Sequence, residues 1–220
     1  MSDEAQAAAY AQADFAQVNQ GFVDRFRASF PEVVAGAMVD LGCGPGDIPV
    51  RFARALPGFT ITAIDGSEPM IALAQRAVQA SGLEGRVLPR RARLPMLPLA
   101  LRSFDAVVSN SLAHHMPDPL LFWNEVGRLG RPGAAVLIMD LLRPESAERA
   151  RAIVEQYSGD EAPVLKEDFF NSLCAAFTLR EIRSQIGSRG LGGLVCELAS
   201  DRHWIVWGHL PKGIQKGPPP

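Results

Sequence analysis

Short apolar runs alternate with amphipathic stretches along most of this 220-residue chain. Such alternation is typical of proteins in which parallel strands are joined by crossover helices. We therefore expect a mainly parallel sheet. The runs that predict its strands are AMVDLG at 37–42, FTITAID at 59–65, a less distinct one near 86–89, FDAVVSN at 104–110 and AAVLIMD at 134–140.

Two further apolar runs, LVCELAS and HWIVWGH, close the pattern and are separated only by Asp201 and Arg202. So short a connection forces an antiparallel hairpin, because a parallel crossover needs about a dozen residues. Trp204 and Trp207 lie three apart in the second run and are expected on opposite faces of the strand. The predicted fold is α/β: a doubly wound, Rossmann-like sheet of about seven strands, with helices on both faces and a terminal antiparallel hairpin.

The stretches between the apolar runs have helical periodicity. In the first of them, apolar side chains at spacings of three to five form one stripe, which predicts a helix over 5–30. This stripe either covers a crevice as a lid or packs against the sheet as core. Its members are Tyr10, Phe15, Val18, Phe22 and Phe26. The other predicted helices lie at 48–56, 69–80, 119–129, 144–157 and 166–186, the last with a break near 177–178.

The predicted organisation is a helical lid over residues 1–35, one globular domain over 36–210 and a flexible tail over 211–220. The formal net charge of −2 argues against nucleic acid as a partner. The three cysteines lie far apart, which disfavours a disulfide framework or a metal site. No signal peptide and no apolar run of about 18 residues is present, so we expect a cytoplasmic protein, monomeric or homodimeric, without a membrane partner.

The most specific motif is VDLGCGPGD at 39–47, placed between a strand and a helix. Glycines at 42, 44 and 46 allow a tight turn and a close approach of the backbone to a ligand. Asp40 ends the strand, where it either orients the loop or accepts from a cationic amino group. Asp65 ends the second strand, 19 residues after Gly46, and a carboxylate there suits both ribose hydroxyls of an adenosine. Taken singly, the glycine loop also fits an ordinary turn and Asp65 an ordinary strand cap.

The glycine spacing is GxGxG, whereas dinucleotide-binding proteins carry GxGxxG. An acid follows directly, Asp47, at the start of the helix. That position suits a cationic amino group or a hydroxyl better than a phosphate. A nicotinamide-dependent oxidoreductase is thus disfavoured.

Four motifs resemble, in order and spacing, those of the class I S-adenosylmethionine-dependent methyltransferases, and most closely the small-molecule branch that includes quinone-biosynthesis enzymes. They are VDLGCGPGD, ITAIDGSEPM, SFDAVVSNSLAHHM and RLGRPGAAVLIMD. The resemblance implies S-adenosylmethionine as cofactor and S-adenosylhomocysteine as product. It also implies that Gly42, Cys43, Gly44 and Gly46 line the methionine half, that Asp65 holds the ribose with Gly66, Ser67 and Met70 beside the adenine, and that Asn110 and Ser111 offer backbone groups to the amino-acid end.

One segment departs from the family pattern. The family usually places an acid after the third strand, which accepts from the adenine amino group, whereas this chain has RRARLPMLP at 90–98. The backbone amide of Ala92 is a possible replacement contact, and Arg91 or Arg93 could stack on the ring.

Two adjacent histidines, His114 and His115, follow the fourth strand. Either is a candidate general base, His115 being slightly favoured, because imidazole titrates near neutral pH. The alternative is that both cap or pack beneath the next helix. Candidate acceptor contacts are Tyr10, Arg143 and Tyr157, for which the alternatives are core packing or a solvated helix face.

The sequence thus predicts an S-adenosylmethionine-dependent methyltransferase that acts on a small-molecule acceptor. The alternative from another class is a structural or regulatory subunit that binds the cofactor without transfer. The acceptor and the methylated atom are not encoded in any motif that we recognise.

Overall fold

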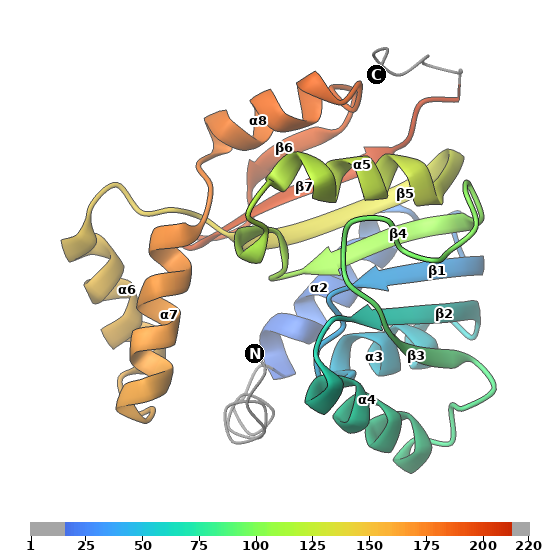
Figure 1. Cartoon of the computed structure of the whole chain (residues 1–220), viewed down its shortest axis with the longest axis horizontal. Coiled ribbons are helices and arrows are strands. Elements are labelled where there is room, and N and C mark those ends of the chain that lie inside the picture. The colour runs from blue at the N-terminus through green and yellow to red at the C-terminus, as the bar shows by residue number, and fades with distance from the viewer. Residues whose placement is uncertain (1–15, 213–220) are drawn as a thin grey trace.

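A seven-stranded sheet in the order β3-β2-β1-β4-β5-β7-β6 runs through the computed structural model, which describes residues 16–212 (Figure 1). Strands β1 to β5 pair in parallel, whereas β7 is antiparallel to both of its neighbours. The predicted sheet and its terminal hairpin are confirmed. The strands are β1 Ala35–Leu41, β2 Gly58–Asp65, β3 Val87–Arg91, β4 Phe104–Asn110, β5 Gly130–Leu141, β6 Val195–Leu198 and β7 His203–His209.

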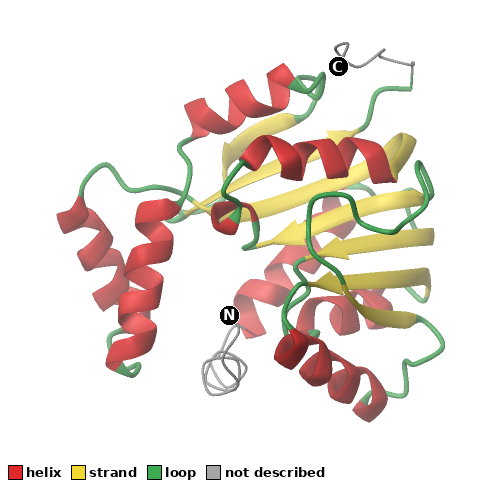
Figure 2. Ribbon diagram, in the orientation of Figure 1, coloured by secondary structure: helices red, strands yellow, loops and turns green. Residues whose placement is uncertain are grey.

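Helices cover both faces of this sheet (Figure 2). One buried cluster joins the sheet to α2 (Ala16–Ser29), α3 (Asp47–Ala55) and α4 (Glu68–Ala80). A second cluster joins the opposite face to α5 (Pro119–Leu129) and α8 (Leu179–Ser188). The fold is therefore doubly wound, as predicted.

The two clusters follow from the alternation of side chains along each strand. In β1, Met38 belongs to the first cluster and the next residue, Val39, to the second. In β7, Trp204 is buried in the second cluster, whereas Trp207 packs against the first. The prediction that the two tryptophans lie on opposite faces is confirmed.

Two helices, α6 (Ala147–Ser158) and α7 (Pro163–Ala175), stand beyond the end of β5 and pack on each other around a small core of their own (Figure 1). The predicted break near 177–178 separates α7 from α8. It arises because the Thr178 side chain accepts from the Glu181 amide while Glu181 reaches back to the Thr178 amide. This capping box starts a new helix.

The structure differs from the sequence prediction at the terminal hairpin and does not describe either end of the chain. The hairpin connection is 199–202, longer than the predicted two residues, because β6 already ends at Leu198. The first helix is described from Ala16 onward, and its Phe22 and Phe26 are buried in the core. Tyr10 lies outside the described residues, as does most of the predicted tail, so the lid over 1–35 and the tail over 211–220 stay predictions.

Within residues 16–212, no helix combines the length and apolarity needed to cross a membrane.

A buried ion pair holds the proline-spaced connection after β3. Glu125 is 3% exposed and accepts from the amides of Met96 and Leu97. Arg128 donates to Glu125 at 2.7 Å and to the carbonyls of Leu97 and Leu99. Two side chains of α5 thereby fix a loop that has no regular secondary structure.

Replacing Glu125 with alanine is expected to lower the free energy of unfolding by about 2–4 kcal/mol, because Arg128 loses its carboxylate partner and the amides of Met96 and Leu97 lose their acceptor. Urea denaturation measures this change. The matched control is Glu84→Ala at an exposed position, for which a change within about 0.5 kcal/mol is expected. Equal effects of the two substitutions would contradict the role of Glu125.

Candidate functional site

The order of the strands reverses between β1 and β4, so their carboxyl ends flank a crevice. In open α/β sheets, ligands bind at this switch point. The glycine loop leads from β1 into α3 at the same place, and β2 ends beside it at Asp65. The residues predicted to bind a cofactor are therefore brought together.

Backbone contacts to β2 shape the glycine loop. The amides of Gly42 and Cys43 donate to the carbonyl of Ile64 at 2.8 and 2.9 Å, and the Gly44 amide donates to Asp65 Oδ2 at 3.0 Å. Gly44 has a φ of +53°, and a Cβ added there would meet no atom within 4 Å. The loop thus presents bare backbone to open space, which suits a ligand that approaches closely.

The last glycine of the loop has a packing role. Gly46 has a φ of +91°, and a Cβ there would lie 2.9 Å from Ala74 Cα in α4. The glycine therefore allows α3 and α4 to approach each other. A contact of Gly46 with the cofactor stays a prediction.

Both oxygens of Asp65 accept from backbone amides, Oδ2 from Gly44 and Oδ1 from Ser67 at 2.8 Å. Ser67 is in turn the N-cap of α4 and accepts from the amide of Met70, a residue that is 2% exposed. Each carboxylate oxygen retains a second lone pair. Asp65 can therefore order the two loops and still accept from the two hydroxyls of a ribose.

Asp40 is 1% exposed, and its Oδ2 is buried without a hydrogen-bond partner. Burial, together with the negative charge of Asp65, raises the pKa of Asp40 to about 8. Both facts describe a carboxyl group that lacks a counterion. A ligand with a cationic amino group beside the loop would supply one.

Cys43 is a packing residue in this structure. It is buried, and burial raises the pKa of its thiol well above the usual range, with a further contribution from the nearby acids Asp40 and Asp65. The side chain therefore stays a neutral thiol, which rules out a thiolate nucleophile at neutral pH.

The segment after β3 supplies no acceptor for an adenine amino group. Arg91 pairs with Glu68, and Arg93 lies against Gly66 and donates from Nε to its carbonyl at 3.3 Å. The Ala92 amide, predicted as a replacement contact, donates instead to the carbonyl of Asp65 at 3.0 Å. It does so because the parallel pairing of β2 with β3 continues for one more residue. That part of the prediction is wrong.

Asn110 and Ser111 lie at the end of β4, on the rim of the crevice. The Ser111 amide donates to the carbonyl of Met139 in β5 at 3.0 Å, so this amide already has a hydrogen-bond partner within the sheet. Ser111 also has a φ of +58°, which is uncommon for a residue other than glycine. Such backbone conformations are often found at functional sites.

A buried histidine–aspartate pair follows β4. His114 Nδ1 lies 2.6 Å from Asp140 Oδ1, and both side chains are almost fully buried. Asp140 also accepts from the amides of His114 and Leu141. Because a carboxylate only accepts, Nδ1 carries the proton in this pair. The sequence analysis missed Asp140, although an acid at the carboxyl end of a buried strand was the available signal.

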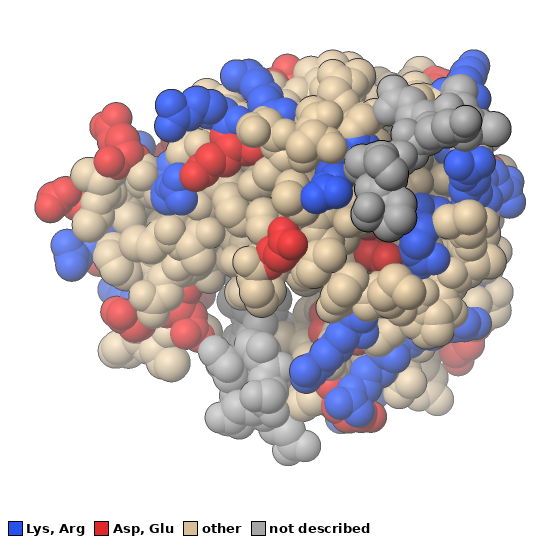
Figure 3. Space-filling model, turned by 45° about the horizontal axis from the view of Figure 1, so that its top comes forward, with Lys and Arg blue, Asp and Glu red and all other residues tan. Residues whose placement is uncertain are grey.

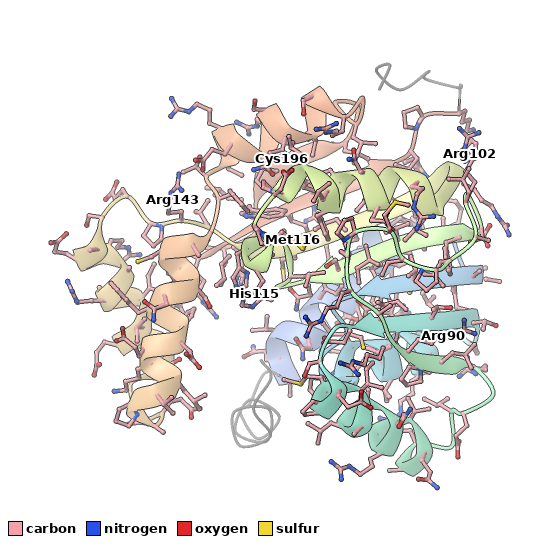
Figure 4. The ribbon with its side chains drawn as sticks, viewed as in Figure 1. Arg90, Arg102, His115, Met116, Arg143 and Cys196 are labelled. Carbon is pink, nitrogen blue, oxygen red and sulfur yellow. The ribbon has the colours of Figure 1, made fainter. Side chains whose placement is uncertain are left out.

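His115 ends a short 3-10 helix, Ala113–His115, which follows β4 (Figure 4). Burial and the adjacent ring of His114, whose centroid is 3.9 Å away, lower the pKa of His115 to about 4. It is therefore neutral at pH 7 and a weak base. A catalytic role of either histidine stays a prediction, but the low pKa of His115 makes His114 the better candidate base, which reverses the order expected from the sequence.

A side-chain NMR titration of the histidines tests this reversal. We expect the His115 ring to stay neutral until about pH 4, against an ordinary value of 6.5, and His114 to show a protonated Nδ1 at pH 7. The variant His115→Gln assigns the signals. A His115 midpoint near 6.5, or an Nε2-protonated His114, would contradict the assignment.

Arg143 and Tyr157 are the two candidate contacts for the methyl acceptor that lie beyond β5. Both side chains are held by other residues of the chain. Arg143 pairs with Glu181 at the start of α8 (Figure 4). Tyr157 donates to Asp201 at 3.1 Å, and the guanidinium of Arg202 lies 3.4 Å from the centre of its ring. A direct contact of either residue with an acceptor stays a prediction.

Comparison with known proteins finds similarity to methyltransferases. Residues 39–138 match a family model described as a methyltransferase domain. The chain is 33% identical over 110 residues to a demethylmenaquinone methyltransferase from Lactiplantibacillus plantarum, a match that covers 49% of this chain and 46% of that protein. It is 32% identical over 120 residues to a ubiquinone biosynthesis O-methyltransferase from Caulobacter sp., covering 54% of this chain and 46% of that protein. The chain thus spans about half the length of these curated relatives.

A solved structure extends the likeness over nearly the whole chain. The crystal structure of a SAM-dependent methyltransferase from Aquifex aeolicus superposes with a TM-score of 0.70 at 17% identity, over 94% of this chain and 98% of that one. At this identity the likeness concerns the fold alone.

Proposed function

We propose that the chain is a class I S-adenosylmethionine-dependent methyltransferase of the small-molecule branch that includes quinone-biosynthesis enzymes, and that it binds S-adenosylmethionine and methylates a small organic acceptor. The observation that carries the proposal is the buried, unpartnered oxygen of Asp40 next to the glycine loop and Asp65. A buried carboxylate oxygen without a donor is costly. The amino group of the cofactor supplies the missing donor.

The residues fit two of the three parts of the cofactor. Asp40 and the loop 42–46 hold the amino-acid end, with charge pairing at Asp40 and backbone contacts at Gly44. Asp65 accepts from the ribose hydroxyls. The adenine part lacks the acid that is usual in the family, since Arg91 and Arg93 occupy the corresponding segment.

When bound, S-adenosylmethionine supplies a methyl group already activated on a sulfonium, whose carbon–sulfur bond breaks with the electron pair left on sulfur. The chain then has to align the nucleophilic atom of the acceptor and to remove its proton where it carries one. His114 removes that proton through Nε2, because Asp140 holds the ring by Nδ1. Asp140 acts as a positioning residue.

A small acceptor is supported by the printed names of the two curated relatives, both of which refer to quinone biosynthesis. Acidic and basic side chains are also interspersed on the face shown in Figure 3, which does not resemble a nucleic-acid-binding surface.

Calorimetric titration with S-adenosylmethionine, S-adenosylhomocysteine and NAD tests the proposal. We expect the two adenosyl ligands to bind and NAD to show no binding. A panel of hydroxylated, amino and thiol acceptors, followed by detection of S-adenosylhomocysteine, then tests transfer. Binding of NAD in preference to the adenosyl ligands would refute the cofactor assignment.

A further inference from the structure

A hollow of about 330 Å³ lies between α2, the end of β5 and the β6–β7 hairpin. Its volume falls in the range of small-ligand sites. Apolar side chains from three elements line part of it, namely Phe22, Met139 and Ile205. Four polar side chains complete the lining: Arg25, Ser200, Arg202 and His203.

The hollow adjoins the cofactor crevice. Met139 pairs in register with Asn110, the last residue of β4, and accepts from the amide of Ser111. His203 begins β7, which is antiparallel to β5, so it also lies at the carboxyl end of the parallel strands. A molecule in the hollow would therefore lie one strand away from the rim of the crevice, on the face covered by α2.

The charged side chains that line the hollow are both arginines. Arg202 is 16% exposed, and its nearest acid, Asp201, lies 3.5 Å away. The same Asp201 also lies 3.7 Å from Arg149 and accepts from the hydroxyl of Tyr157. One carboxylate thus serves two arginines, which leaves an excess of positive charge at this end of the hollow.

The side chain of Arg25 provides a second, independent sign that a hydrogen-bond acceptor is missing from the hollow. One of its terminal nitrogens pairs with Glu197, but its Nε is buried and has no hydrogen-bond partner. Among the described residues, four side-chain atoms are in that condition, and another of them is Asp40 Oδ2 in the cofactor site. Such a buried donor is free to pair with an acceptor group of a ligand.

From this arrangement we infer that the hollow receives the methyl acceptor and that the acceptor is a small organic acid, with its apolar body against Phe22, Met139 and Ile205 and its carboxylate at Arg25 and Arg202. Arginine suits this role because its planar donor fork matches a carboxylate. The inference rests on the proposed function. It also gives Tyr157 the role of a positioning residue that holds Arg202 by stacking.

Calorimetry on the full chain saturated with S-adenosylhomocysteine tests the inference with two probes of equal shape, benzoate and benzamide. We expect benzoate to bind at least about tenfold more tightly, because only the acid pairs with the arginines. The variants Arg25→Gln and Arg202→Gln, on separate elements, should each lose most of this preference. The matched control Arg27→Gln, at an exposed arginine of α2 that pairs with Asp24 and does not line the hollow, should keep the preference within about twofold.

Equal binding of the two probes, absence of binding at millimolar concentration, or an unchanged preference in both arginine variants would overturn the inference. Affinity for S-adenosylhomocysteine is measured for every variant and should not change. If that ligand fails to bind the unsubstituted chain, the proposed function fails, and the benzoate preference measured without it still tests the hollow.

Discussion

Replacing Asp65 with alanine is expected to weaken the binding of S-adenosylhomocysteine by about a hundredfold or more, which corresponds to about 2.7 kcal/mol. The complex loses the two proposed charge-assisted hydrogen bonds between the Asp65 carboxylate and the ribose hydroxyls, each worth about 1.5–3 kcal/mol. The amides of Gly44 and Ser67 also lose their acceptors, so the loops that face the ligand become less ordered. Calorimetric titration measures the change.

Two controls separate ligand contact from loop support. Asp65→Asn retains one acceptor oxygen, and we expect an intermediate loss of affinity. Glu68→Ala removes a nearby exposed carboxylate that pairs with Arg91, and should leave affinity within about twofold. A change of less than about threefold for Asp65→Ala would contradict the ribose assignment.

Replacing Asp40 with asparagine is expected to stabilise the protein without ligand and to weaken cofactor binding. The fold raises the pKa of Asp40 from its ordinary value of 3.8 to about 8. Between these pH values the folded chain retains a proton that the unfolded chain has released, so stability falls as pH rises through this window. Asparagine removes that dependence. The variant should gain about 2–4 kcal/mol at pH 7 and almost nothing below pH 4.

Thermal and urea unfolding across this pH range measure the gain in stability. The control Asp24→Asn, at an exposed carboxylate of α2, should change stability by less than about 0.5 kcal/mol at any pH. Calorimetry in two buffers with different ionisation enthalpies should show that the unsubstituted chain releases close to one proton per ligand at pH 7, and that Asp40→Asn releases none. Loss of stability in Asp40→Asn at pH 7, or ligand binding without proton release, would count against the role of Asp40.

The fold could be predicted because its signals are local. The strand runs around Val39, Val107 and Leu137 are apolar and contiguous, since parallel strands are buried on both faces. The hairpin followed from the length of one connection. β3 was the least distinct strand because it lies at the sheet edge and contains Pro89 and two arginines, so its apolar run is short.

The site was predictable only where its residues lie within one motif. The loop at 42–46 and the acid at Asp65 follow directly from strands. By contrast, Asp140 contacts His114 although the two lie 26 positions apart in the sequence. The hollow is lined by α2 and by a hairpin some 180 residues later. Periodicity within a segment does not predict contacts between segments so far apart. The order of the two histidines as candidate bases could not be predicted for a related reason. Burial and the neighbouring ring, which a sequence does not display, lower the pKa of His115.

A crystal structure of the protein with S-adenosylhomocysteine tests the central claim most directly. The account predicts that both ribose hydroxyls lie within hydrogen-bond distance of Asp65 and that the amino group lies beside Asp40, with the amino-acid end against Gly44. A ligand bound elsewhere, or bound at this crevice with its ribose away from Asp65, would contradict it.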